Sequence, residues 1–131
     1  MRRDTTTFSV MTAKENKIIH KIREIGHKVV PLGSHVWLYG SRARGDAHEG
    51  SDWDLLILLN KPKLEASDYD VTYPFRTLGW EIGEEINPHI YTQKQWDEWT
   101  FLPFRKNVEQ DKFILLWVWR MKNEKRWLRY I

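Results

Sequence analysis

Two groups of residues that could carry out chemistry stand close together in the first half of the chain. Gly40 and Ser41 follow the apolar run 36–39, and a glycine-serine turn after such a run can present backbone N–H groups to a phosphate. Asp52 and Asp54 stand at the start of the apolar run 55–59, where a buried strand is expected. The spacing therefore predicts a turn for anions beside a pair of carboxylates.

The two aspartates are predicted to act together. Residues two apart in a strand point to the same face, so Asp52 and Asp54 would project side by side, with Trp53 on the opposite face. Two like charges held that close repel each other. A divalent cation such as Mg²⁺ relieves this repulsion, because it takes carboxylate oxygens and keeps positions open for water and phosphate. The arrangement indicates chemistry on a nucleoside triphosphate.

The extended pattern resembles the signature of the DNA polymerase beta nucleotidyltransferase superfamily, in which Gly-Ser, a short linker and Asp-x-Asp precede an apolar strand. It is most similar to the small minimal nucleotidyltransferases, which carry G-S-R-A-R-G together with S-D-x-D-L. The matching residues are Gly40, Ser41, Arg42, Ala43, Arg44, Gly45, Ser51, Asp52, Asp54 and Leu55. The resemblance implies an α/β (α+β) fold, a small mixed β-sheet with helices packed on one side, as a single domain over residues 1–131.

The resemblance also implies an activity. The enzyme would transfer a nucleoside monophosphate, AMP from ATP, to a hydroxyl of an acceptor and release pyrophosphate. Asp52 and Asp54 would be the catalytic and metal-binding residues, with two Mg²⁺ ions in the active complex. The glycine-serine turn would bind the triphosphate. Arg42 or Arg44 would neutralise charge on the departing pyrophosphate at the nucleotide site, or else would face solvent.

The sequence departs from the family's pattern at the third carboxylate, which normally comes from the next strand and serves as metal ligand or general base. In the candidate strand 85–92, Asn87 stands where that acid is expected. Its amide can ligate a metal through the carbonyl oxygen but brings no charge. Glu85 and His89 lie two residues to either side, so alternation predicts the same face, and either could partly substitute. Pro88 removes a ladder donor, which predicts an edge or bulged strand.

A second class of function stays open. Minimal nucleotidyltransferases act beside small helical HEPN-type proteins, so the resemblance also implies a weakly active or inactive antitoxin-like module that binds such a partner. Asn87 favours this alternative if neither Glu85 nor His89 reaches the metal site. We expect the acceptor to lie in a groove shared with another subunit of a homo-oligomer, or on a partner protein. A template-dependent polymerase is not expected, and neither is nucleic acid as a partner.

Composition bounds the remaining possibilities. The 131 residues are the size of one domain, and the net charge of +3 is a mild bias. Zero cysteines exclude disulfides and thiolate metal sites, and we expect a cytoplasmic protein. The apolar runs 55–59 and 113–119 are too short to cross a bilayer, and residues 1–10 do not resemble a signal peptide, so no membrane partner is expected.

Capping boxes at Thr12–Glu15 and Thr92–Gln95 predict the starts of two helices, the first ending near Gly26 or shortly beyond, before Pro31. The other predicted elements are strands 35–39, 53–59, 85–92 and 113–118, and helices 41–47, 66–82 and 104–110. Pro74 is expected to start or kink the helix 66–82. Residues 1–10 are expected to be a loose arm. The basic, aromatic tail 120–131 favours an amphipathic helix packed on its own domain or on a dimer mate, over a segment that binds RNA or an acidic partner.

Overall fold

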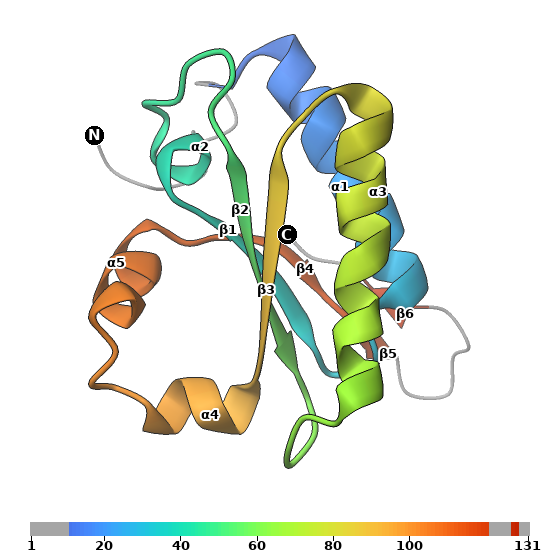
Figure 1. Ribbon diagram of the computed structural model, residues 1–131, viewed down its shortest axis with the longest axis vertical. Helices are drawn as coiled ribbons and strands as arrows, with labels where there is room; N and C mark the ends of the chain where they lie inside the picture. The colour runs from blue at the N-terminus through green and yellow to red at the C-terminus, as the bar shows by residue number, and fades with distance from the viewer. Residues whose placement is uncertain (1–10, 121–126, 129–131) are drawn as a thin grey trace.

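A computed structural model describes residues 11–120 and 127–128 of the chain. Four strands form one mixed sheet in the order β3-β2-β1-β4, in which β2 and β3 are parallel and the other pairs are antiparallel (Figure 1). The elements are α1 (Ala13–Val29), β1 (His35–Tyr39), α2 (Ser41–Arg44), β2 (Trp53–Leu59), η2 (Ala66–Thr72), α3 (Tyr73–Ile82), β3 (Ile86–Thr92), α4 (Gln93–Glu98), α5 (Pro103–Asp111), β4 (Phe113–Trp117), β5 (Trp119–Arg120) and β6 (Trp127–Leu128). The predicted fold class is confirmed.

Both predicted capping boxes are present. The Thr12 hydroxyl accepts from the Glu15 amide at 3.0 Å, and the Glu15 carboxylate accepts from the Thr12 amide at 3.0 Å, which starts α1. Thr92 and Gln95 make the same reciprocal pair at the start of α4. These local hydrogen bonds satisfy backbone donors that have no partner inside a helix.

The middle of the chain also follows its proline signals. The predicted helix 66–82 is divided into the 3-10 helix η2 and the α-helix α3, and Pro74 lies in the first turn of α3, where no amide donor is needed. β3 begins at Ile86, one residue later than predicted, and is an edge strand of the sheet. The edge position predicted from Pro88 is therefore confirmed.

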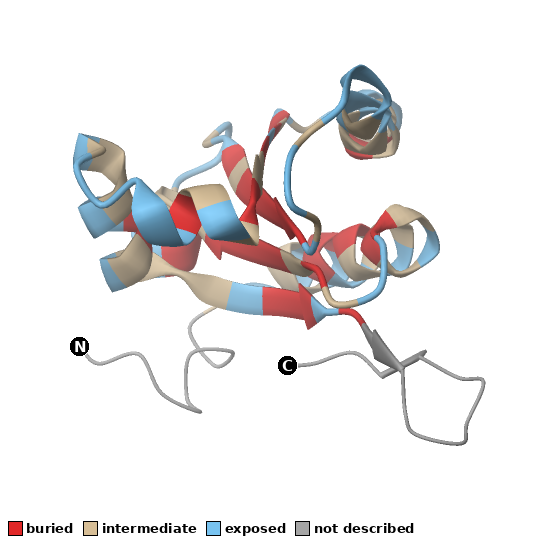
Figure 2. Cartoon of the chain, turned by 90° about the horizontal axis from the view of Figure 1, so that it is seen from below, coloured by how far each residue is buried: buried red, intermediate tan, exposed pale blue. Residues whose placement is uncertain are grey.

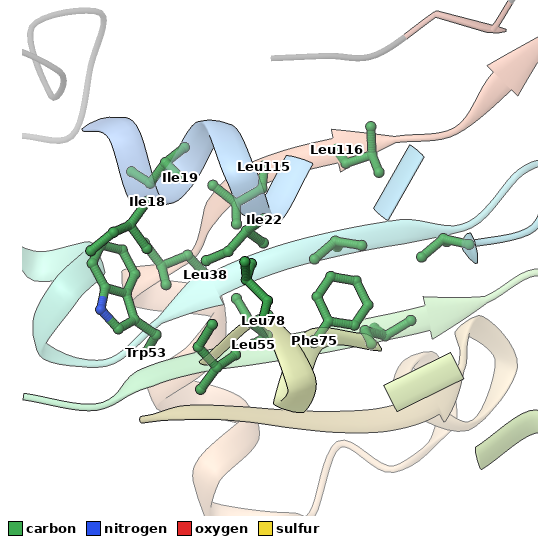
Figure 3. Packing of buried hydrophobic residues seen from close by; sticks show 14 of the residues in the cluster. Ile18, Ile19, Ile22, Leu38, Trp53, Leu55, Phe75, Leu78, Leu115 and Leu116 are labelled. Atoms are coloured by element: carbon green, nitrogen blue, oxygen red, sulfur yellow. The ribbon is translucent and has the colours of Figure 1, made fainter. Parts of the chain in front are cut away.

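The two faces of the sheet are covered by different helices. α1 and α3 pack on one face, which we call the α1/α3 face; its core includes Ile18, Ile22, Phe75 and Leu78 (Figures 1 and 3). The short helices α4 and α5 pack on the opposite face, the α4/α5 face, in a second cluster of buried residues: Trp37, Leu56, Leu58, Trp96 and Val108.

Helices cover both faces of the sheet, whereas the expected arrangement had helices on one side only. The cause lies in β2, whose residues Leu55–Leu59 are all buried, so apolar side chains project from both faces of the sheet and each face needs a cover. Seen from below, the buried strands lie between outer layers of half-buried and exposed helix residues (Figure 2).

Two predicted segments, the N-terminal arm and the C-terminal tail, lie at the ends of the chain. The predicted N-terminal arm lies outside the described residues, as do 121–126 and 129–131 of the predicted tail. Trp119–Arg120 and Trp127–Leu128 form an antiparallel pair, so the predicted tail helix is wrong at 127–128. Across the part of the chain that the structure describes, no helix is both long enough and apolar enough to cross a membrane. The cytoplasmic location stays a prediction.

Candidate active site

Gly40 joins β1 to α2 in a conformation that suits only glycine. Its φ is 78° and its ψ is −161°, a combination that side-chain-bearing residues rarely adopt. A Cβ added to Gly40 would lie 2.7 Å from Oδ2 of Asp54. The missing side chain therefore allows the Asp54 carboxylate to approach the backbone of the turn, so the two predicted groups of functional residues lie close together.

The turn continues directly into the single helical turn of α2. The amides of Ala43 and Arg44 both donate to the Gly40 carbonyl at 3.0 Å. The amides of Ser41 and Arg42 precede these donors, at the position where a helix start leaves N–H groups without an intrahelical acceptor. Such amides, next to the Ser41 hydroxyl, are donors suited to phosphate oxygens.

Asp52 and Asp54 flank the first residue of β2. Trp53 is fully buried on the α1/α3 face, whereas Asp54 is half-buried and Asp52 is exposed, as the predicted alternation requires. The parallel register of β2 and β3 places Asn87 beside Asp54. The Asn87 Nδ2 donates to Oδ2 of Asp52 at 3.2 Å. Asn87 thus joins the aspartate pair at the position where a third acid was expected.

Burial raises the pKa of Asp54, and the negative charge of Asp52 acts in the same direction, while the Asn87 amide, His89 and Arg44 oppose the shift. A half-buried carboxylate whose charge is disfavoured is a group that a cation would stabilise. His89 lies two residues after Asn87 on β3, and its side chain is exposed.

Glu85 is placed differently from its two predicted companions. It precedes the first residue of β3, its side chain is exposed, and its backbone carbonyl accepts from the Trp53 amide at 2.8 Å. Its observed link to β2 is therefore made by the backbone.

Tyr39 belongs to the site but was not singled out from the sequence. The antiparallel register pairs it with Asp54, and burial, followed by the charges of Asp54 and Tyr91, raises its pKa to about 12. The phenol therefore stays protonated at neutral pH. Its position two residues after buried Trp37 was the available signal, because alternation along β1 sends both side chains to the α4/α5 face.

The two arginines of the motif point to different faces. Arg44 is exposed and its guanidinium contacts Asp111 at 2.9 Å and Asp46 at 3.2 Å; both hydrogen bonds raise the pKa of Arg44. Arg42 is only 8% exposed and lies against Glu15 at 2.8 Å. Residues two apart in a helix are separated by about 200°, which explains the divergence. Arg42 therefore does not face solvent.

The donor set at the aspartates fits a hard cation. Asp52 and Asp54 offer carboxylate oxygens, and Asn87 offers an amide oxygen, the ligand types that Mg²⁺ takes. Gly40 leaves open the space beside Asp54 that a side chain would fill. Within residues 11–120 and 127–128, no group of three or more His, Cys, Asp or Glu residues is arranged to hold a metal. The described residues therefore offer a cation two acids and one amide at this place.

A fold and a site of this kind define a nucleotidyltransferase. Residues 16–118 match the family described as "Nucleotidyltransferase domain", and the chain belongs to this family. The match confirms the resemblance that the motif indicated.

Solved structures share the fold. A toxin-antitoxin crystal structure with AMP-PNP has a TM-score of 0.53 and 16% identity, with 74% of this chain and 71% of that chain covered. A protein of Sulfolobus solfataricus, named as a provisional nucleotidyltransferase, has a TM-score of 0.51 and 21% identity, with 89% of this chain and 92% of that chain covered. No curated protein sequence matches the chain.

Proposed function

We propose that this nucleotidyltransferase uses Mg²⁺ and transfers AMP from ATP to a hydroxyl of an acceptor, with release of pyrophosphate. The close approach of the Asp54 carboxylate to the Gly40 turn carries the proposal, because it would bring donors for phosphate beside ligands for a cation. The family membership and the toxin-antitoxin neighbour with AMP-PNP support an adenine nucleotide as the substrate.

We assign parts in this reaction to Asp52, Asp54, Asn87, Ser41 and Arg44. Asp52, Asp54 and the Asn87 amide oxygen would hold the metal, which when bound neutralises phosphate charge and lowers the pKa of the attacking hydroxyl. The amides and hydroxyl at Ser41 would bind the triphosphate. Arg44 would place its positive charge beside the phosphates, in exchange for part of its contact with Asp111.

The chemical step is a displacement at the α-phosphorus. The acceptor oxygen forms a bond to this phosphorus, the bond to the bridging oxygen breaks, and the electron pair leaves with pyrophosphate. Asn87 cannot take the proton of the hydroxyl. Because Asp52 and His89 are exposed, the site is open to water, and the proton leaves to solvent. We therefore expect a slow enzyme compared with family members that carry a third acid.

Isothermal titration with ATP and with GTP, with and without Mg²⁺, tests the nucleotide site. We expect Mg²⁺-dependent binding of ATP by the natural protein and its loss in Asp52→Asn and Asp54→Asn, with the urea unfolding curve little changed. A double variant that binds Mg·ATP like the natural protein would refute the assignment. Transfer of label to protein from ATP labelled at the α-phosphate, but not from γ-labelled ATP, would distinguish nucleotidyl from phosphoryl transfer.

Asn87 favours a second candidate function, a weakly active or inactive antitoxin-like module that binds a HEPN-type partner. Without a third carboxylate, a nucleotide site can be kept for binding alone. This candidate predicts Mg·ATP binding without transfer of α-label, even when candidate HEPN proteins are supplied as acceptors. Label transfer to such a protein would decide for the enzyme.

A further inference from the structure

The Arg42 side chain connects the two parts of the candidate site, the Gly40 turn and the segment that carries Asp52 and Asp54. It lies two residues after Gly40, yet its Nε and Nη2 donate to the carbonyl of Ser51 at 3.3 and 3.0 Å. Ser51 directly precedes Asp52. One side chain thus fixes the distance between the backbone of the phosphate turn and the backbone that carries the aspartate pair.

Other contacts hold the guanidinium in this position. Its Nη1 donates to Glu15 at 2.8 Å, its Nη2 lies 3.7 Å from Glu84, and its carbon lies 4.7 Å from the ring centroid of Trp53. The Trp53 Nε1 donates to Glu84 at 3.0 Å. Trp53 stands between the two aspartates and packs among the core residues of the α1/α3 face, next to Ile18 (Figure 3).

The site elements need such support because they are weak by themselves. α2 has four residues and no side-chain cap, and an isolated turn of helix is unstable. Most of the loop 45–51 between α2 and Asp52 is exposed. Glu84 lies three residues before Asn87, so the same cluster also ties the start of β3 to the turn.

We propose that Arg42 is a positioning residue: held by Glu15 and Glu84, it acts through the Ser51 carbonyl to set Asp52 and Asp54 against the Gly40 turn for metal-dependent nucleotide binding. It does not contact the nucleotide. Glu15 on α1, whose side chain is 16% exposed, acts with Arg42 because it holds the guanidinium in place. This inference rests on the proposed Mg²⁺-dependent nucleotide site and departs from the initial expectation that Arg42 binds the nucleotide.

The test compares Arg42→Lys and Glu15→Gln. Lysine keeps the charge but loses the planar fork that bonds Ser51 and Glu15 together. Glutamine keeps the capping box of α1, because either residue serves there, and removes only the charge that holds Arg42. Arg105→Lys is the matched control, since Arg105 also donates to a backbone carbonyl, that of Trp96, and lies 5.5 Å from the Trp96 ring on the α4/α5 face.

The first measurement is ATP affinity in saturating Mg²⁺ and in chelator. We expect both Arg42→Lys and Glu15→Gln to reduce the Mg²⁺-dependent gain in affinity by about tenfold or more, the usual effect of removing an outer support of a metal site. Affinity in chelator should stay the same, and the double variant should lose little more than the worse single variant. Arg105→Lys should keep the full gain.

Other results would overturn the inference. If Arg42 touched the triphosphate, Arg42→Lys would lose affinity in chelator too, and Glu15→Gln would keep or increase affinity by releasing the guanidinium. If Arg42 served stability alone, both variants would unfold at lower urea with the Mg²⁺-dependent gain intact.

Amide hydrogen exchange on the nucleotide-free protein separates this inference from the proposed function. We expect faster exchange at 40–45 and 51–54 in Arg42→Lys and Glu15→Gln, with β4 unchanged. Unaltered exchange at both segments refutes the positioning role, whether or not the protein binds Mg·ATP. Absence of Mg·ATP binding by the natural protein refutes the proposed function, and the exchange result still decides on the positioning role.

Discussion

Replacing Gly40 by alanine should damage the site and the fold together, for two reasons that can be separated. The backbone conformation, φ 78° and ψ −161°, costs a non-glycine residue about 1–3 kcal/mol. The new Cβ would also lie 2.7 Å from Oδ2 of Asp54, and relieving such a contact by moving neighbours costs about 1–3 kcal/mol. We therefore expect Gly40→Ala to lower the free energy of unfolding by about 2–6 kcal/mol.

Urea unfolding and Mg·ATP titration on the same samples measure both consequences. The unfolding midpoint should fall by about 1–3 M, given the usual slope of about 2 kcal/mol per M of urea for a small domain. Mg²⁺-dependent ATP binding should weaken at least tenfold in the folded variant, because Asp54 must move away from the turn. Gly50→Ala is the control: its φ is 89°, but a Cβ there would meet nothing within 4 Å. Only the backbone cost, about 1–2 kcal/mol at most, is expected for it.

A double-mutant cycle isolates the contact with Asp54. In an Asp54→Ala background the carboxylate is gone, so Gly40→Ala should cost about 1–3 kcal/mol less than in the natural protein. Equal costs in the two backgrounds would show that the turn and the carboxylate do not touch. A Gly40→Ala protein with natural stability and natural Mg·ATP affinity would refute the whole argument for this site.

Three further predictions concern other parts of the molecule. Asn87→Asp should raise the Mg²⁺-dependent affinity for nucleotide by about tenfold, the equivalent of roughly 1.4 kcal/mol. Without Mg²⁺ it should lower the free energy of unfolding, because the new carboxylate repels Asp52 and Asp54. An unchanged affinity in titration would contradict the assignment of Asn87 to the metal site. Burial, and then the charge of Lys112, lower the pKa of His35, so the unfolded chain takes up a proton near pH 6.5 that the folded chain does not. The free energy of unfolding should therefore fall as pH drops below about 6.5. In urea unfolding between about pH 7.5 and 5, His35→Phe should depend less on pH than the natural protein, and an equal dependence would contradict this. Thr92→Ala should cost about 1 kcal/mol in urea unfolding by removing the cap of α4, with Mg·ATP affinity unaffected.

Local signals in the sequence were sufficient for most elements. The capping boxes at Thr12 and Thr92 are contacts between residues three apart, so their outcome depends on little else. Pro74 and Pro88 act on their own backbone. The predicted pairing of Asp52 with Asp54 followed from alternation along a strand whose apolar run fixed its extent. Such features are decided within a few residues, and a sequence read locally contains them.

Other features depended on distant partners. Arg44 contacts Asp111, which is 67 positions away, and no local pattern links the two residues. Arg42 and Glu15 are 27 positions apart. The second helical layer was missed although the apolar run of β2 required it, because the expected family arrangement was given more weight than the burial of both faces.

The alternation along β2 also ties the geometry of the predicted site to the packing of the core. Trp53 packs in the core of the α1/α3 face, and its neighbours in the sequence, Asp52 and Asp54, lie at the predicted metal site. The register between β2 and β3 that pairs Trp53 with Ile86 also pairs Asp54 with Asn87. A slip of one residue would bury a carboxylate and expose an indole, so burial of Trp53 selects the register that assembles the site. The Arg42 guanidinium lies over the Trp53 ring and donates to the Ser51 carbonyl. The core packing that holds Trp53 therefore also holds Arg42, and through it the spacing between the phosphate turn and the aspartate pair.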